Sequence, residues 1–209
     1  LAIVTMPDAE TDCRIFWPPD VSGESCDCTV CVHADAHNAG TATIQHAIDT
    51  VRARGGGTIC LDVGTYLLRA PLNLQNVRSL RMRGQGWRTV LQATVAGGAI
   101  DIVRGIGVTI ENLSIAGIVD GKQTTAMIDV AHSVDLKLAH LTIAAAAATG
   151  ATSAAIGLSG IIISASVRDC VLAAEQVVVA TPGELNYLLT ANLGLTDNVL
   201  LCGQRGIGL

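Results

Sequence analysis

The chain has 209 residues, half of them hydrophobic, and carries a net charge of −5 with a sequence pI of about 5.4. This length allows one domain with a substantial core. A negative net charge argues against nucleic acid or an anionic membrane surface as the main partner, because both favour clustered Lys and Arg. Aromatic residues make up 2% of the chain, and an apolar mass of Ala, Val, Ile and Leu suits thin stacked β-layers.

Residues 1–40 are interpreted as a lead-in segment that contains four of the seven cysteines: Cys13, Cys26, Cys28 and Cys31. With His33 and His37 nearby, these cysteines are a candidate zinc site, since Cys and His are the usual ligands of structural zinc. Disulfides and free thiols are the alternatives, and we expect no cofactor other than this zinc. Cys60 and Cys170 fall at inward strand positions and are predicted to be small core hydrophobes.

Residues 43–54 predict an amphipathic helix that ends at the three glycines 55–57. Four apolar residues fall on one face of this helix: Ile44, Ala47, Ile48 and Val51. Thr41 or Thr43 is the candidate N-cap. A helix at this place would cover the open end of the first layer of strands, which would otherwise be an exposed sheet edge.

A pattern of about 28 residues repeats along the rest of the chain. Each copy has apolar residues at its first, third, sixth and eighth positions, as expected for two short strands separated by a bend. The clear copies begin at Val108, Leu136, Ala165 and Leu193, and a degenerate copy begins at Leu80.

The fifth position of each copy is predicted to lie at the bend between the two strands. It is occupied by Gly84, Asn112, His140, Asp169 and Asp197. These residue types tolerate a left-handed backbone better than others do. Because the repeat is defined by its apolar positions alone, this composition supports it independently.

A third strand per repeat is predicted just upstream of the first two. Its apolar residues include Ile100, Ile128 and Ile156, which are again 28 residues apart. Stacked repeats of three strands bury a continuous core that no single repeat could bury. The pattern therefore predicts an all-β solenoid over 41–209, a parallel β-helix with coils of about 28 residues from about residue 58 onward and an N-terminal capping α-helix. A leucine-rich repeat is disfavoured, because its motif and its helix are missing from every copy.

Several stretches in 41–117 carry a family resemblance: Thr43–Asp49, Gly55–Leu61, Gly64–Leu67 and Leu80–Gly86. They resemble the opening of the pectin-lyase-like superfamily, which includes pectate lyases, polygalacturonases, exo-glucanases and phage tailspikes. The resemblance implies a right-handed β-helix, but these are cap and first-coil motifs and do not specify an activity. The lead-in, with its Cys-Asp-Cys-Thr-Val-Cys segment, is similar to bacterial β-helix repeat proteins of unassigned function, which are often parts of larger proteins.

Asp101 and Asp129 are the candidate catalytic residues. They are 28 residues apart and are predicted to point outward at the same position of neighbouring coils. Two carboxylates about one coil apart reach the separations used by glycosidases. The alternative is that both are solubilising residues on an exposed face. The sequence contains no Asp-Asp, Gly-His-Gly or Arg-Ile-Lys motif of the superfamily's enzymes, and no histidine is assigned as a general base.

Arg81, Arg83 and Arg88 are the candidate ligand-binding residues. Arg81 and Arg83 alternate with apolar residues and are predicted to point outward, with Thr109 and Glu111 beside them one coil later. A cross-strand ion pair is one interpretation of this arrangement. Binding of an anionic ligand, such as a uronate or a sulfate, is the other.

The expected function is that of a non-catalytic β-helix scaffold or recognition module of a larger bacterial protein, because fold alone does not confer activity. The alternative is a polysaccharide lyase or glycoside hydrolase of the superfamily, so a glycan is a candidate partner. Residues 203–209 look like the start of another coil, so the rest of a longer chain or a second copy is expected to cover this end. No membrane span is expected, because Ser and Thr interrupt the uncharged stretch 141–167. No signal-peptide pattern is visible, and the resemblance favours an extracellular or particle-associated location.

Overall fold

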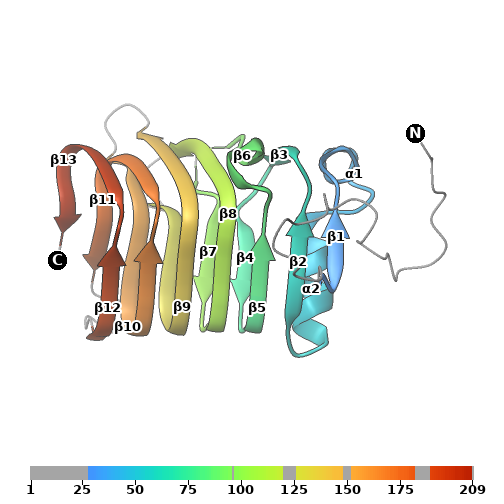
Figure 1. Cartoon of the computed structure of the whole chain (residues 1–209), viewed down its shortest axis with the longest axis horizontal. Coiled ribbons are helices and arrows are strands. Elements are labelled where there is room, and N and C mark those ends of the chain that lie inside the picture. The colour runs from blue at the N-terminus through green and yellow to red at the C-terminus, as the bar shows by residue number, and fades with distance from the viewer. Residues whose placement is uncertain (1–27, 96, 120–125, 148–151, 182–188, 209) are drawn as a thin grey trace.

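The computed structural model describes residues 28–95, 97–119, 126–147, 152–181 and 189–208. These residues are mostly β, with few helices, and their strands form one large network in which all pairings are parallel (Figure 1). The prediction of a β-rich parallel fold is confirmed. In the described part of the chain, no helix has the length and apolarity of a membrane-spanning segment.

The N-terminal end of the sheet is formed by strand β1 (Val30–Val32), helix α1 (Ala34–Ala39), helix α2 (Ile44–Ala53) and strand β2 (Gly57–Leu61). Helix α2 is the helix predicted from the sequence. Its four predicted apolar residues are buried, and the Thr43 hydroxyl accepts a hydrogen bond from the backbone N–H of His46 as an N-cap. Strand β1 pairs with β2, so residues 30–39 of the lead-in are part of this end. Figure 1 shows α2 beside β2 at this end.

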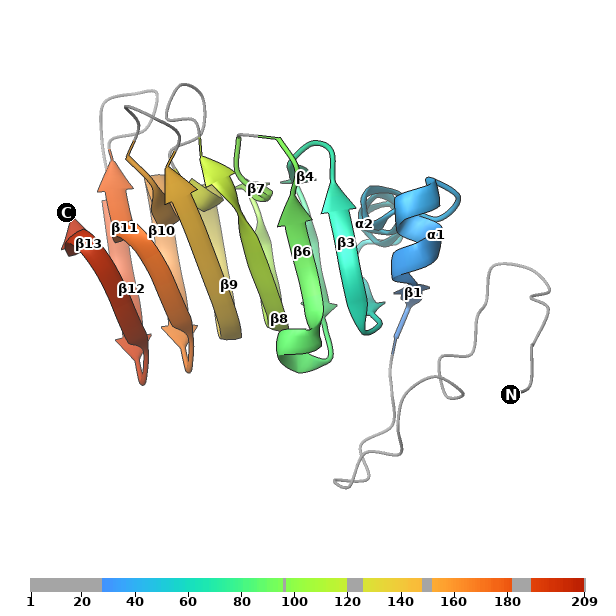
Figure 2. The same ribbon diagram turned by 90° about the horizontal axis from the view of Figure 1, so that it is seen from above.

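The remaining elements follow in chain order. They are β3 (Gly64–Leu68), β4 (Leu72–Gln75), β5 (Arg78–Arg83), the 3-10 helix η2 (Gly86–Arg88), β6 (Thr89–Ala93), β7 (Ile100–Val103), β8 (Ile106–Val119), β9 (Ala126–Ala147), β10 (Ala154–Arg168), β11 (Val171–Thr181), β12 (Leu189–Thr196) and β13 (Val199–Gly208). Figure 2 shows the strands side by side from β3 to β13, with both α-helices at the N-terminal end.

The strands pair in three parallel ladders. One ladder joins β4, β7, the first parts of β9 and β10 and the last parts of β11 and β13, and places Ile100 opposite Ile128 and Ile128 opposite Ile156. A second runs from β1 through β2, β5, β8, β9 and β10 to β12, and a third links β3, β6, β8, β9, β11 and β13. The starts of the four clear repeats face one another in the second ladder. The predicted 28-residue spacing is therefore the spacing of strand pairing.

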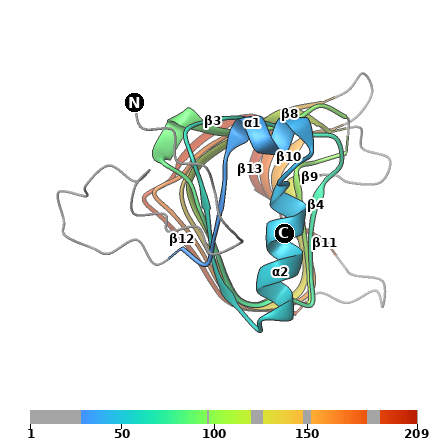
Figure 3. The ribbon, with the colours of Figure 1, turned by 90° about the vertical axis from the view of Figure 1, so that its right-hand side faces the viewer.

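The core consists of the inward aliphatic residues of all three ladders, stacked from one repeat to the next. Ile100, Ile128 and Ile156 are each fully buried, and the same core cluster extends from Val32 to Ala180. Seen from the end in Figure 3, the strands of successive repeats follow one common outline, and α2 lies across it. Burial of this continuous apolar column is the main source of stability.

The predicted bend positions adopt the left-handed backbone in four of five cases. Asn112, His140, Asp169 and Asp197 have φ angles of 53° to 55°. The prediction was wrong for Gly84, whose φ is not positive. A Cβ at Gly84 would overlap the carbonyl oxygen of Asn112, so this position requires glycine for space and not for its dihedral angle.

We predict that Asn112→Ala is about 1 kcal/mol less stable than Asn112→Gly. Both variants remove the Asn112 side chain, and a left-handed backbone costs an L-residue with a Cβ roughly 1–2 kcal/mol. The urea midpoints of the two variants measure this difference. Equal midpoints would mean that the bend relaxes and that the left-handed conformation is not required.

Candidate active site

Asp101 and Asp129 lie directly opposite each other on the neighbouring strands β7 and β9. Both side chains alternate with buried isoleucines and valines and therefore point away from the core, as predicted. The strand register aligns the two acids with further residues: Asn73 of β4 lies opposite Asp101, and Gly157 of β10 lies opposite Asp129. These four residues form one column across the sheet. Neighbouring strands are about 4.8 Å apart, so the backbones of the two residues are separated by about one strand spacing.

The two acids differ from ordinary surface carboxyl groups in their protonation. The pKa of Asp129 is raised from 3.8 to about 6, mainly by burial and also by the negative charge of Asp101, while a hydrogen bond from the backbone of Ala126 opposes both effects. Burial also raises the pKa of Asp101. Two half-buried carboxyl groups in register thus form a pair in which one member holds its proton more firmly than the other.

A second column follows the acids at the corner that ends the first ladder. It begins at Asn76 and continues with Arg104 one repeat later and His132 two repeats later. The side-chain oxygen of Asn76 accepts a hydrogen bond of 2.7 Å from Nε of Arg104. Nδ1 of His132 accepts a hydrogen bond of 3.4 Å from the backbone N–H of Ile161. Asn76, Arg104 and His132 all have left-handed backbone conformations. The corner thus carries an arginine and a histidine three residues after Asp101 and Asp129 respectively.

His132 was not assigned a role from the sequence. A histidine just before a strand gives no signal by itself, because a single histidine is more often structural than catalytic. The signal that could have found it is its position three residues after Asp129, with Arg104 three residues after Asp101. The 28-residue spacing, applied to both positions, places Asp101 and Asp129 in one column and Arg104 and His132 in the next.

The arginine candidates lie on another part of the repeat. Arg81 and Arg83 of β5 face Thr109 and Glu111 of β8, as the sequence predicted. Nε of Arg81 donates a hydrogen bond of 2.7 Å to Glu111, and Nε of Arg83 is 3.9 Å from the same carboxylate. This arrangement is the cross-strand ion pair of the first interpretation. The third candidate, Arg88, is exposed on η2, and anion binding by these residues stays a prediction.

Two of the four candidate zinc ligands are oxidised. Cys28 forms a disulfide with Cys60, and Cys31 is also disulfide-bonded, so in this structure neither offers the thiolate that zinc requires. Cys13 and Cys26 lie outside the described residues. No group of three or more His, Cys, Asp and Glu side chains suited to a metal ion occurs in the part of the chain that is described.

Cys60 was predicted from the sequence to be a small core hydrophobe, which accounts for its burial but not for its disulfide. It is buried, but it takes part in the disulfide, because pairing of β1 with β2 brings the lead-in cysteines to the start of the first repeat. Cys170 is a buried free thiol, as predicted, and Cys202 is an exposed one.

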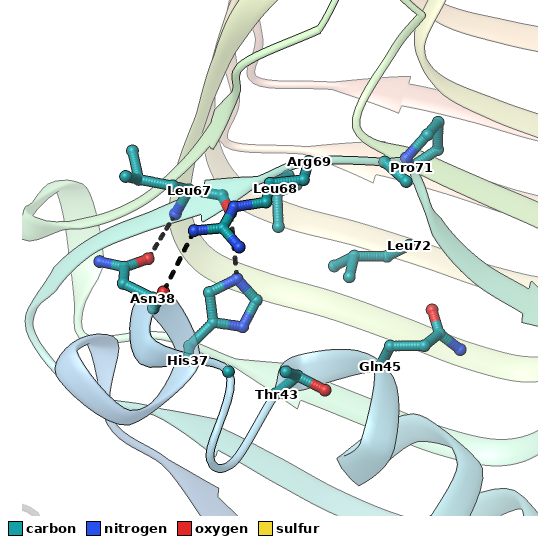
Figure 4. A pocket seen from close by; sticks show the side chains of 11 residues that line it. His37, Asn38, Thr43, Gln45, Leu67, Leu68, Arg69, Pro71 and Leu72 are labelled. Carbon is teal, nitrogen blue, oxygen red and sulfur yellow. Dashed lines mark hydrogen bonds between the residues drawn. The ribbon is translucent and has the colours of Figure 1, made fainter.

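A cavity of about 230 Å³ lies between the α1–α2 connection and the turn from β3 to β4 (Figure 4). The polar groups that line the cavity form hydrogen bonds with the surrounding protein. Nδ1 of His37 accepts a hydrogen bond from the backbone N–H of Ile44, its Nε2 donates to the carbonyl of Leu67, and Asn38 accepts from the N–H of Leu67. Burial lowers the pKa of His37, which favours its neutral form. These bonds hold the N-terminal helices against the first strands, and neither acid lines the cavity.

Comparisons with known proteins are consistent with the fold and leave the activity open. No family model matches the chain, and no curated protein sequence is significantly similar to it. Among solved structures, a protein named "putative glycosyl hydrolase" from Parabacteroides merdae is similar over 75% of this chain and 86% of its own, with a TM-score of 0.51 and 15% sequence identity. At this identity the likeness concerns the fold alone.

Proposed function

We propose that the chain is a right-handed parallel β-helix of the pectin-lyase-like type whose acid pair hydrolyses glycosidic bonds. The observation that carries the proposal is the in-register pair Asp101 and Asp129, with the pKa of Asp129 raised to about 6. Glycosidases use two carboxyl groups of unequal pKa, one protonated and one ionised. The similarity to the Parabacteroides merdae protein, which is named a "putative glycosyl hydrolase", also favours this proposal over the non-catalytic module that the sequence favoured.

The unequal pair assigns the roles. Asp129 holds the proton and donates it to the glycosidic oxygen as the bond to the anomeric carbon breaks, while the Asp101 carboxylate attacks that carbon and forms an ester. Asp129, now ionised, removes a proton from water, and the resulting hydroxide cleaves the ester and frees Asp101. The two acids stand on adjacent strands, whose spacing of about 4.8 Å is nearer to the ~5–5.5 Å between the carboxyl groups of retaining enzymes than to the wider separation in inverting ones, so the product is expected to keep the substrate's anomeric configuration.

The test is hydrolysis of a panel of neutral and acidic glycans and of aryl glycosides, with the anomer of the first product read by NMR. Asp101→Ala should lose the activity, and azide should restore turnover of an aryl glycoside by forming a glycosyl azide of inverted configuration. The control is Asp135→Asn, which changes an acid on β9, the strand of Asp129, that pairs with Lys137 at 3.2 Å. Equal rates for wild type and Asp101→Ala on every substrate would overturn the proposal.

An exposed aliphatic column lies beside the corner and offers a surface for sugar rings. Ile106, Val134 and Ile163 are in register on β8, β9 and β10, and are 46%, 36% and 39% exposed. Apolar side chains that stay exposed in line with one another mark a contact surface better than scattered ones do. In a chain with few aromatic residues, these side chains provide the apolar face for a sugar ring.

We predict that Val134→Gln raises KM for a glycan several-fold and leaves kcat unchanged. The substitution removes apolar contact with bound sugar but touches neither acid, which is the signature of lost uniform binding. Steady-state kinetics on a long and a short substrate measure the effect, with Val171→Gln on another ladder as the matched exposed control. Equal KM values in both variants would mean that sugar does not contact this column.

The second candidate function is the non-catalytic scaffold or recognition module. The observation that favours it is the group of exposed apolar residues on the last described strand, where Val199 and Leu201 are 53% and 56% exposed. Such residues are suited to contact with a further repeat or a partner chain. Under this proposal, Asp101→Ala and Asp129→Asn would change stability but no enzymatic rate.

The disulfide supports a location in an oxidising compartment. A structural disulfide such as Cys28–Cys60 persists outside the cytosol and is rare within it. An extracellular, periplasmic or particle-associated location is therefore part of the proposal, in line with a glycan as the substrate.

A further inference from the structure

Strand β10 carries a glycine next to each of the two outward columns at the site. Gly157 lies opposite Asp129 in the ladder, and Gly160 follows at the corner, next to His132. Both glycines are buried although they lie on the outer side of the sheet. The covering atoms belong to the previous repeat.

Gly157 is covered by the carboxyl group of Asp129. A Cβ at Gly157 would overlap Oδ1 of Asp129, and would lie 3.4 Å from its Cγ and 3.1 Å from Cβ of Ala126. The φ angle of Gly157 is not in the left-handed region, so the backbone itself does not require glycine here. Glycine at 157 is required for the space that the carboxyl group occupies.

Gly160 is covered by the ring of His132. A Cβ at Gly160 would lie 2.7 Å from Nδ1 and 2.8 Å from Nε2, so the imidazole lies across the glycine. The N–H of Ile161, the next residue, donates to Nδ1 and leaves the proton of the neutral ring on Nε2. Gly157 and Gly160, three residues apart on β10, thus lie under the Asp129 carboxyl group and the His132 ring.

We propose that Gly157 and Gly160 are positioning residues of the acid pair, forming a two-glycine notch in β10 that holds the Asp129 carboxyl group and the His132 ring. The notch turns the Asp129 side chain from water onto the backbone of the next strand. It also holds the His132 ring at the corner with Nδ1 as the acceptor, so that Nε2 is the ring's N–H donor. The consequence for catalysis depends on the proposed glycosidase function, whereas the seating of the two side chains does not.

The test is the titration of the Asp129 carboxyl carbon by NMR in wild type, Gly157→Ala and Gly194→Ala. In wild type the midpoint is expected near pH 6. Gly157→Ala should lower it by at least one pH unit, because the added methyl group pushes the carboxyl group out toward water. Gly194→Ala is the control, since its Cβ would have no atom nearer than 4.0 Å. An unchanged midpoint in Gly157→Ala would overturn the proposal, whatever the enzymatic activity proves to be.

For His132 the readout is hydrogen exchange of the Ile161 amide. Gly160→Ala should accelerate this exchange at least tenfold, because the displaced ring no longer accepts the bond. Gly160 has a φ of +68°, so the control is Gly107→Ala, which has nearly the same φ of +66° and no atom within 3.7 Å of the new Cβ. Equal exchange in both variants would count against the notch.

A double variant keeps the proposal testable if Gly157→Ala is poorly folded. In the Asp129→Ala background the new methyl group no longer meets a carboxyl oxygen, so the drop in Tm caused by Gly157→Ala should fall to less than half. The same drop in both backgrounds would show that the glycine serves the strand and not Asp129. If the effects of Gly157→Ala and Asp129→Ala on Tm are coupled as expected but the protein hydrolyses no glycan, the notch is supported and the glycosidase function is rejected.

Discussion

Asp129→Asn is expected to make the protein more stable at pH 7 and at the same time to remove its hydrolytic activity. The carboxyl group is half-buried beside Asp101, and its pKa is raised from 3.8 to about 6. At pH 7 the folded protein therefore carries a charge that its surroundings disfavour. A neutral amide relieves this cost, which a rise of about two pKa units puts on the order of 2–3 kcal/mol. Loss of the proton donor should lower kcat roughly 10²–10⁴-fold.

The pH dependence of stability distinguishes relief of the buried Asp129 charge from a change in side-chain packing. Between pH 4 and pH 6 the folded state binds a proton at Asp129 that the unfolded state has already released. The contribution of this group to stability therefore falls as the pH rises through that window and stays low above it. Asp129→Asn should remove this part of the slope, so the gain over wild type should be small at pH 4 and largest above pH 6.

Urea unfolding of the wild type and Asp129→Asn at pH 4, 5, 6 and 7 measures both quantities. Asp135→Asn is the matched control on β9, because Asp135 is 47% exposed and pairs with Lys137. Its removal should change stability by less than 1 kcal/mol. If Asp129→Asn is less stable than the wild type at pH 7, then burial of the ionised Asp129 carboxyl group does not destabilise the folded protein, and the proposed acid pair is contradicted.

The strand pairing could be predicted from the sequence because it depends on residues that repeat at one spacing. Burial fixes which side chains face inward, and a slip by one residue would expose the whole apolar set. The 28-residue interval between Ile100 and Ile128 therefore determined the register, and the bend residues Asn112 and His140 agreed with it. The helix at 44–53 followed from its apolar face and its cap.

The position of the candidate acid pair could be predicted from the sequence, because Asp101 and Asp129 share one column. The burial of the Asp129 carboxyl group could not, because part of it comes from atoms of the next repeat. Gly157 gives no positive signal in a sequence, since its role is the absence of a side chain beside Asp129. The disulfide was left open among three alternatives, because spacing alone does not tell which cysteine of the lead-in reaches Cys60.

Loss of the Cys28–Cys60 disulfide is expected to cost about 3–4 kcal/mol of the free energy of unfolding. The bond closes a loop between residues 32 apart in sequence, and a cross-link of this span removes about that much chain entropy from the unfolded state. Cys28→Ser tests this in urea, because Cys28 is only partly buried and serine replaces it with little change in packing. Cys202→Ser is the control, since Cys202 is an exposed free thiol.

The loss should begin at the N-terminal end of the sheet. Strand β1 is short and pairs with β2 through three residues, so the disulfide is an important covalent tie, beside hydrogen bonds such as that from the Tyr66 hydroxyl to the carbonyl of Val32, between the lead-in and the first repeat. In stacked repeats each layer depends mainly on its neighbours, and weakening one end loosens that end before the middle. Amide exchange in Cys28→Ser should therefore accelerate in β1, α2 and β2 and stay slow where β9 pairs with β10. Uniform acceleration along all three ladders would mean instead that the repeats unfold as a single cooperative unit, with the disulfide stabilising all of it.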